Sequence, residues 1–431
     1  MKSFDAIVVG AGPAGITAAL KMAQKGLRVI LLERGEFPGS KNMFGGMIPG
    51  SPVFNELIPD FWDHAPWERY VVRRELTVLS EHASTSFSFE TMNFDRPPYN
   101  GYTLYRPVFD KWYAEQARKA GAQLITGCLV EDLLWEESSI AGVRVGRDQG
   151  DIRAKVVVAC DGALSLLAKK AGLRRDFNLS QMGVGIRALF RLPEEEINQR
   201  FNLVRQQGVA KAFLGCTEGI RGGGFIYTQT DTLSVGLVFH LQSLKEKKIP
   251  PYELLERFIR RDPVRQFIKG SRLLDFSAHL IPEGGWSMVP KLSMNGLLVA
   301  GDAAALCYTD GLNQEGMNLA AASGSLAAET VIEAFSRGDF SGKQMARYDE
   351  RLRGSFVLKN MKTARKICDF MHNDRLFSLY PEVIGNVMEQ IYLADGNSRR
   401  GFGHIAWNAI RKGVPLPQLL ADFWNGGRSL I

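Results

Sequence analysis

The chain begins with an apolar run, a segment of helical spacing and a second apolar run. Residues 4–9 fit a buried strand, and residues 28–33 fit a second strand after the helix. Strands that alternate with helices are typical of a parallel sheet covered on its faces. The opening pattern therefore predicts a Rossmann-type α/β domain.

The same style continues as far as residue 160. Residues 35–50 form a long glycine-rich stretch, which we interpret as a loop. Residues 102–121 contain a helix with apolar spacing that ends at Gly121. Strands are expected over residues 122–126 and 156–159, with a hairpin between them near Gly142.

The pattern changes between residues 180 and 290. Four short β-rich runs predict strands of an antiparallel sheet, and an amphipathic helix follows; they lie at residues 184–192, 211–214, 224–228, 233–240 and 251–267. From residue 297 the first style returns. We therefore predict an α/β fold in which a discontinuous domain (1–180 with 290–342) carries an inserted antiparallel-sheet domain (181–289). A helical region (343–431) follows.

A glycine fingerprint follows the first strand. Gly10, Gly12 and Gly15 form Gly-x-Gly-x-x-Gly around Pro13 and Ala14, and Glu33 ends the second strand 18 residues after Gly15. Such a turn brings backbone N–H groups to a pyrophosphate, and the acid accepts a ribose hydroxyl bond. This arrangement predicts a bound dinucleotide.

Two further motifs extend the fingerprint. Asp161-Gly162 follows the strand at 156–159, and Gly301-Asp302 follows the strand at 296–300. Asp302 is placed to hold a ribityl or ribose hydroxyl. The helix start near Gly316–Asn318 would favour negative charge on a reduced flavin.

Charge and cysteine usage limit the remaining chemistry. The net charge is +7, and residues 343–375 hold nine Lys or Arg against four acids. Such a face suits an anionic membrane, an acidic partner or plain solvent, and no nucleic-acid motif accompanies it. The five cysteines are 32 or more residues apart, so no iron–sulfur or zinc motif is predicted. With the first strand starting at Phe4 and no apolar run of spanning length, we expect a cytoplasmic protein.

The three glycine–acid motifs resemble those of two-domain FAD oxidoreductases of the hydroxylase-like class. Residues 38–46 (PGSKNMFGG), 278–286 (AHLIPEGGW) and 316–320 (GMNLA) narrow the resemblance to the FixC and electron-transfer-flavoprotein:quinone oxidoreductase family. The resemblance implies FAD as cofactor, with catalytic candidates Lys41, Asn42 and His279. The implied cofactor-binding residues are Gly10, Gly12, Pro13, Ala14, Gly15, Glu33, Arg34, Lys41, Asn42, Gly45, Gly46, Arg106, Val130, Asp161, Gly162, Gly301, Asp302, Gly316, Met317 and Asn318.

The resemblance also implies partners. In the family, FAD takes electrons from an electron-transfer flavoprotein and passes them to membrane quinone. The chain lacks the cluster cysteines of its longer relatives, so a [4Fe–4S] cluster is expected only in a separate small ferredoxin-like (FixX-type) subunit. We expect peripheral contact with the inner face of the cell membrane. We also expect the chain to be a subunit of a Fix-type complex, for which electron bifurcation is one possible activity.

Three alternatives remain at this stage. A geranylgeranyl-reductase-type enzyme shares the flavin motifs but hydrogenates prenyl chains, an aromatic hydroxylase fits the 308–311 segment poorly, and a flavin relay subunit would have no turnover of its own. No second glycine fingerprint indicates a bound nicotinamide, because Gly219–Gly224 is better explained as a hairpin turn. Lys41 is equally compatible with a solvated loop lysine, and Trp286 and Met288 with core residues instead of a quinone slot.

Overall fold

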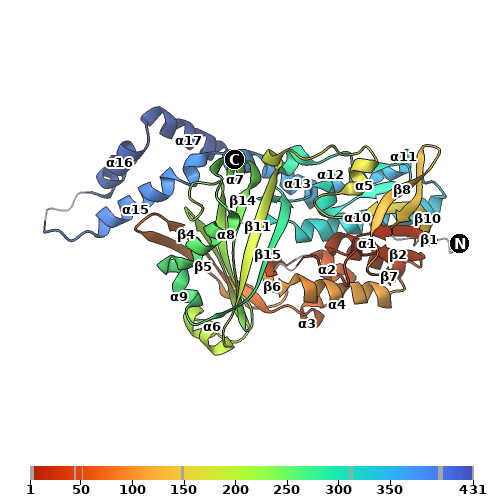
Figure 1. The fold of residues 1–431 in the computed structure, drawn as a ribbon, viewed down its shortest axis with the longest axis horizontal. Helices are drawn as coiled ribbons and strands as arrows, with labels where there is room; N and C mark the ends of the chain where they lie inside the picture. Colours follow the sequence, from red (N-terminus) through yellow and green to blue (C-terminus); the bar gives the residue numbers. More distant parts are fainter. Residues whose placement is uncertain are drawn as a thin grey trace.

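Two sheets and a set of C-terminal helices make up the chain (Figure 1). The structure is a computed structural model, and it describes residues 4–42, 45–50, 52–146, 150–309, 311, 314–396 and 401–429. The sheet nearest the N-terminus lies against several helices, and the second sheet lies between it and the last C-terminal helices.

The first sheet is the predicted parallel one. Its strands run in the order β16-β17-β10-β1-β2-β7, with bounds β16 Ser293–Met294, β17 Leu297–Val299, β10 Gly150–Ala159, β1 Phe4–Val9, β2 Val29–Leu32 and β7 Gln123–Ile125. All neighbours from β17 to β7 are parallel, and Val8 on β1 lies opposite Val158 and Leu31. The carboxyl ends of β1, β10 and β17 therefore meet at one edge, as the three motifs require.

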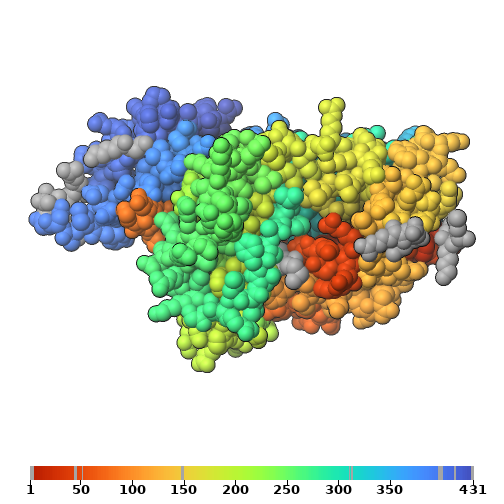
Figure 2. Space-filling model, viewed as in Figure 1, coloured from red at the N-terminus to blue at the C-terminus, as the bar shows by residue number. Residues whose placement is uncertain are grey.

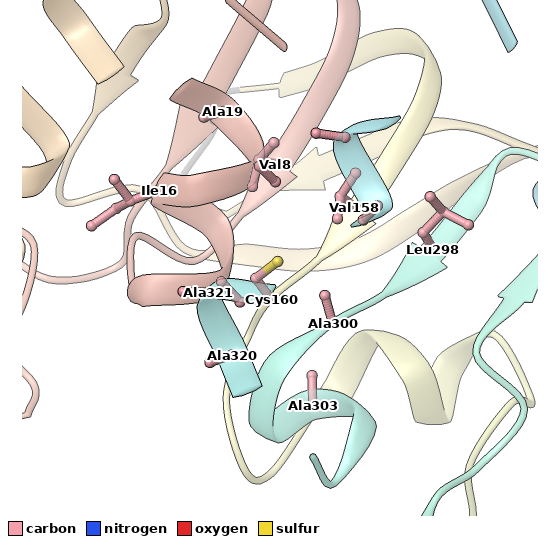
Figure 3. Packing of buried hydrophobic residues seen from close by; sticks show 14 of the residues in the cluster. Val8, Ile16, Ala19, Val158, Cys160, Leu298, Ala300, Ala303, Ala320 and Ala321 are labelled. Carbon is pink, nitrogen blue, oxygen red and sulfur yellow. The ribbon is translucent and has the colours of Figure 1, made fainter. Parts of the chain in front are cut away.

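Small residues let two helices approach this sheet closely. Helices α1 (Pro13–Gln24) and α10 (Met317–Arg337) pack on each other, and α1 packs on β1 and β10 (Figure 3). A side chain at Gly324 would place its Cβ 2.1 Å from the Ala14 carbonyl oxygen, so only glycine permits this contact. The alanine-rich start of α10 is thus explained by packing, with Ala320 and Ala321 facing the core.

The second sheet has nine strands. Its order is β15-β11-β14-β13-β12-β4-β6-β3, with β5 beside β4, and its bounds are β15 Arg272–Pro282, β11 Met182–Arg191, β14 Thr232–His240, β13 Gly222–Thr228, β12 Gln207–Leu214, β4 Arg69–Leu79, β6 Gly101–Tyr105, β3 Gly45–Pro49 and β5 Ser84–Glu90. Most pairs are antiparallel, and β12 with β4 is parallel. Four strands come from residues 45–105, so this sheet extends beyond the inserted segment, whose boundaries stay a prediction.

Two local predictions are wrong, those for residues 35–50 and 251–267. The stretch 35–50 is not all loop, because β3 pairs with β6. The hairpin predicted near Gly142 is confirmed, because β8 (Val130–Glu136) and β9 (Ser139–Val145) pair antiparallel, and Gly142 itself lies inside β9. A Cβ at Gly142 would lie 2.1 Å from the Ile152 carbonyl oxygen, so this glycine serves a close approach between strands.

The predicted helix over 251–267 is two helices. Helix α8 (Pro251–Arg260) and helix α9 (Asp262–Ile268) are separated at Arg261, whose backbone is extended. Pro263 has no N–H to continue the ladder of α8, and it fits the first turn of a new helix instead. The glycine-rich turn before residue 224 is confirmed, since it joins the antiparallel pair β12 and β13.

The C-terminal region is helical as predicted, and its last helices project beside the second sheet (Figure 2). The remaining helices have the bounds α2 Pro52–Leu57, α3 Phe61–His64, α4 Arg106–Lys119, α5 Leu166–Lys170, α6 Glu194–Phe201, α7 Leu241–Lys247, α11 Gly342–Met345, α12 Arg347–Gly354, α13 Phe356–Thr363, α14 Arg365–Phe370, α15 Leu379–Tyr392, α16 Phe402–Gly413 and α17 Leu416–Ser429. Among the described residues, no helix combines the length and apolar character needed to cross a membrane.

Candidate functional site

The glycine fingerprint lies in the turn between β1 and α1. Gly10 has φ +100°, and a Cβ there would be 2.2 Å from the carbonyl oxygen of Cys160 on the neighbouring strand end. A Cβ at Gly15 would be 1.9 Å from the Gly10 carbonyl oxygen. Both positions therefore require glycine, and Pro13 and Ala14 begin the helix between them.

Glu33 fixes this turn from the end of β2. Its Oε2 accepts from the Ala11 N–H (2.8 Å) and its Oε1 from the Gly35 N–H (2.7 Å). The carboxylate is buried, and each oxygen keeps a lone pair for a further donor. The position suits an acceptor for a ribose hydroxyl while it also orders the loop that follows.

Arg106 stands over the glycine turn. It is the first residue of α4, directly after β6, and its guanidinium donates to Asp110 through Nε (2.8 Å) and Nη2 (2.7 Å). A Cβ at Gly12 would lie 3.7 Å from the same Nη2. A bidentate carboxylate thus holds a cation at the place where a pyrophosphate would lie.

The two acid–glycine loops are joined by a residue that the sequence analysis did not single out. Arg174 donates to the carbonyl oxygens of Ala303 (2.9 Å) and Ala163 (3.1 Å), one in each loop. Burial lowers the pKa of Arg174 to about 10, and the charges of Asp161 and Asp302 oppose that shift. Its guanidinium also lies over the Phe177 ring. No local motif marks Arg174, because its partners lie far away in the sequence.

The two acids of these loops differ. Asp161 is used within its own loop, accepting from Ser165 Oγ (3.1 Å) and the Leu167 N–H (3.0 Å). Asp302 instead lies toward the start of α10, with its Oδ1 4.0 Å from where a Cβ of Gly316 would be. Burial raises the pKa of Asp302, while the charges of His279 and Arg106 lower it.

His279 lies on β15, beside Gly185 of β11, and belongs to the same electrostatic group. Burial lowers its pKa, and Asp302 raises it. The structure therefore brings together one acid, one histidine and one arginine from three distant segments, next to the N-terminus of α10. A reduced flavin carries negative charge that such a helix end stabilises.

The remaining candidates are less concentrated. Lys41 is exposed on its loop and Asn42 is half-buried. Gly45 and Gly46 lie in β3, Arg34 is exposed beside Glu33, and Val130 is a buried residue at the start of β8. Gly162 and Gly301 have positive φ, and Met317 and Asn318 form the first turn of α10. Met43, Phe44 and Asp310, which belong to segments quoted above, lie outside the described residues.

No metal centre is built from these side chains. Within the described ranges, no group of three or more His, Cys, Asp or Glu could hold a metal ion. All five cysteines are buried, and none is part of a disulfide. One half-buried acid near this region, Glu283, was only part of a quoted segment in the sequence analysis, since its position depends on the register of β11 and β15.

Comparison with known proteins agrees with this geometry. Residues 5–178 match the family model described as FAD dependent oxidoreductase, and residues 368–431 match the ETF-QO/FixC family C-terminal domain. Among solved structures, a geranylgeranyl bacteriochlorophyll reductase-like protein from Thermoplasma acidophilum superposes with TM-score 0.74 at 21% identity, over 99% of each chain. The flavin-dependent brominase Bmp2 superposes with TM-score 0.64 at 15% identity, over 95% of this chain and 99% of that one. These likenesses show the fold.

The fold and the glycine–acid loops thus define an FAD-dependent oxidoreductase. Two curated relatives then narrow the class. The probable electron transfer flavoprotein-quinone oxidoreductase YdiS of Escherichia coli (strain K12) is 39% identical over 99% of each chain. FixC of the same organism is 39% identical over 92% of each chain. The chain belongs to the FixC/ETF-QO family.

Proposed function

We propose that this chain accepts electrons from an electron-transfer flavoprotein and passes them through FAD to membrane quinone. The observation that carries the proposal is the similarity over nearly the full length to a relative whose name states this activity. The Arg106–Asp110 pair lies beside Gly12, and Asp302 lies near the N-terminus of α10. These two places support a site that binds the pyrophosphate of FAD at one end and its flavin ring at the other.

Each residue of the site has a proposed part. The turn of Gly10, Gly12, Pro13, Ala14 and Gly15 binds the pyrophosphate. Glu33, Arg34 and Val130 surround the adenosine end, and Arg106, Gly162 and Gly301 line the middle. Toward the flavin ring lie Asp302 with Gly316, Met317 and Asn318. Lys41, Asn42, Gly45, Gly46 and His279 face the ring, and Asp161 shapes its loop.

The surface of the C-terminal region supports a peripheral membrane role. Four basic side chains on α13 and α14 are exposed, and none takes part in an ion pair within the described ranges; they are Lys359, Lys362, Arg365 and Lys366. Helices α16 and α17 expose large apolar side chains, including Phe402, Phe423 and Trp424. Cations and apolar rings together suit an anionic membrane surface. A separate ferredoxin-like subunit with a [4Fe–4S] cluster, and a place in a bifurcating complex, complete the proposal.

Purification with the natural partners tests it. FAD and iron content should be measured first, followed by quinone reduction driven by reduced electron-transfer flavoprotein. We expect FAD on this chain, iron on a separable small subunit, and quinol formation. A pure chain that saturates geranylgeranyl groups and leaves quinone untouched would instead establish the prenyl reductase alternative. Flavin reduction without any quinone turnover by the isolated chain would favour the relay alternative.

A further inference from the structure

Glu283 is an enclosed acid at the junction of the second sheet and the C-terminal region. It follows the end of β15, and its N–H donates to the Gln181 carbonyl oxygen (2.8 Å). A Cβ at Gly183 would lie 2.3 Å from its Cδ and 2.5 and 2.6 Å from its two carboxyl oxygens. The carboxyl group therefore fills the space that a side chain at Gly183 would take.

The surroundings of this carboxyl group keep it neutral. No cation or hydrogen-bond donor within the described residues reaches its oxygens, and the residue is partly exposed. Burial raises the pKa of Glu283 to about 8. At neutral pH the group thus holds a proton that it can give up.

His240 lies beside this carboxyl group. Gly183 on β11 is the register partner of His240 on β14, and residues opposite each other project on the same face with Cβ atoms about 5 Å apart. The carboxyl occupies the Gly183 position on that face, so it neighbours the imidazole. His240 is 7% exposed, its Nε2 contacts the Ser180 carbonyl oxygen (2.9 Å), and its Nδ1 has no partner in the described structure.

The row continues to solvent. The ring of His372 lies edge-to-face with that of His240 at 5.7 Å between centroids, and His372 is exposed. Arg221 and Glu246 are the other charged groups that face His240; burial lowers the pKa of His240, and the Ser180 carbonyl raises it. Glu283, His240 and His372 therefore form a line of proton-exchanging groups that ends at the surface.

The inner end of the line points to the candidate flavin site. Burial raises the pKa of the Cys307 thiol, and the negative charges of Asp302 and Glu283 raise it further. Its Sγ is 3.4 Å from where a Cβ of Gly316 would be, at the start of α10. Glu283 is thus near the group of residues that we assign to the flavin ring.

We propose that Glu283 donates a proton to the quinone during its reduction, and that His240 and His372 reload it from solvent. The inference rests on the proposed function. Converting a quinone to a quinol takes two electrons and two protons. Reduced anionic flavin supplies both electrons and one proton. The O–H bond of Glu283 breaks to supply the second proton, and the resulting carboxylate takes a proton from water through the two histidines.

The test compares Glu283→Gln with wild type, using the holoprotein. Glutamine keeps the shape but cannot donate an acidic proton. Glu283→Asp keeps the acid, and Glu256→Gln, an exposed acid of α8, is the matched control. Three quantities are measured: flavin reduction by electron-transfer flavoprotein, flavin reoxidation by a quinone, and the infrared C=O band of protonated carboxyl groups as a function of pH.

We expect E283Q to keep its FAD content and its rate of flavin reduction, and to slow reoxidation by quinone about 100-fold, the lower end for a positioned acid. In wild type the reoxidation rate should fall above about pH 8, where Glu283 loses its proton. The infrared C=O band of the protonated carboxyl group should weaken over the same pH range. E283D should keep a falling limb and an intermediate rate, and E256Q should match wild type. In E283Q we expect neither the fall in reoxidation rate above about pH 8 nor the carboxyl band that titrates there.

Two results overturn the inference. Equal reoxidation rates and pH profiles in E283Q and wild type remove Glu283 from the proton path, while quinone turnover still upholds the proposed function. The absence of a carboxyl band that titrates near pH 8 in wild type shows that Glu283 holds no proton at neutral pH. If electron-transfer flavoprotein reduces the wild-type flavin but quinone does not reoxidise it, the proposed function itself is wrong. The infrared titration still measures the protonation of Glu283 in that case.

Discussion

Two arginine–aspartate pairs share one geometry in very different surroundings. Arg106 and Asp110 of α4 form two bonds of 2.8 and 2.7 Å, and the side chains are 12% and 0% exposed. Arg375 and Asp422 join η5 (Asp374–Leu376) to α17 through bonds of 2.7 and 2.5 Å, and the side chains are 33% and 8% exposed. The first pair lies within one helix, whereas the second joins two elements and is more exposed.

The titration of the two acids follows that difference. Burial raises the pKa of Asp110 in spite of Arg106. Arg375 lowers the pKa of Asp422 to about 2, with burial opposing and Tyr380 adding a hydrogen bond. The Arg106–Asp110 pair is shielded from water and lies where a charged ligand would bind. The Arg375–Asp422 pair, which we call the latch, attaches α17 to η5 at the surface. An arginine–aspartate ion pair thus serves ligand binding in one half of the molecule and the attachment of a helix in the other.

Breaking the first pair should have the largest effect. Arg106→Met leaves Asp110 as a buried carboxyl without its partner, which costs about 3–5 kcal/mol of folding free energy. It also removes the cation beneath the pyrophosphate, so FAD content should fall to a small fraction. Thermal unfolding and flavin absorbance of the purified protein measure the two losses.

The double variant Arg106→Met with Asp110→Leu separates these two losses. Removing both charges should recover most of the stability, because no unpaired buried charge is left. FAD content should stay low. A double variant that regains full FAD content would show that Arg106 only supports the fold.

The next effect concerns the exposed rings of α17. Phe423 and Trp424 are 67% and 66% exposed. Each contributes about 1.5–3 kcal/mol when fully buried, so replacing both with serine should weaken binding to lipid vesicles about 100-fold. FAD content should be unchanged. Trp135→Ser, an exposed ring on β8, is the control, and unchanged vesicle binding of the double variant would exclude these rings from membrane contact.

A smaller effect is expected from the basic face. Lys362, Arg365 and Lys366 changed together to glutamine should weaken binding to anionic vesicles about ten-fold, since each cation near such a surface adds up to about 1 kcal/mol and salt screens it. Binding to neutral vesicles should not change. The same number of charges removed at Lys25, Lys119 and Lys155, which are exposed on the other half, is the control. Equal loss in both triple variants, or none, would contradict a role for this face.

The smallest effect should come from the second pair. The pKa of Asp422 is lower in the folded state than in the unfolded chain, so its stabilisation is present above about pH 4 and is lost as the pH falls toward about 2. With Arg375 one-third exposed, this amounts to about 1 kcal/mol. Asp422→Asn should already show faster amide exchange in α17 at pH 7, with α4 unaffected. Wild-type exchange rates in α17 of that variant would contradict the latch.

The parts of the structure that depend on neighbouring residues in the chain were predictable. Gly10, Gly12 and Gly15 mark their turn by their spacing directly after a strand, and the contact of Gly15 with the Gly10 carbonyl oxygen lies within that turn. The position of Arg106 came from the family resemblance, but its bond to Asp110 is a contact within one helix and needs only the i, i+4 spacing.

The parts that depend on distant pairing were not predictable. Arg174 bonds loops more than a hundred residues apart, and Glu283 is enclosed only because β11 and β15 pair with Gly183 opposite Ile281. The strand β3 was missed because glycines dominate it, and its partner β6 supplies the reason for an extended backbone. The hairpin near Gly142 was predicted, but the close approach of this glycine to Ile152 depends on the pairing of β9 with β10.

The central claim is that electrons pass from electron-transfer flavoprotein through FAD on this chain to quinone. It is tested most directly by anaerobic stopped-flow mixing of the FAD-loaded chain, first with reduced electron-transfer flavoprotein and then with a soluble quinone. We expect the flavin absorbance to bleach in the first mixing and to return in the second, both at rates at least as fast as steady-state turnover. A flavin that stays oxidised with the flavoprotein, or stays reduced with quinone, would contradict the account.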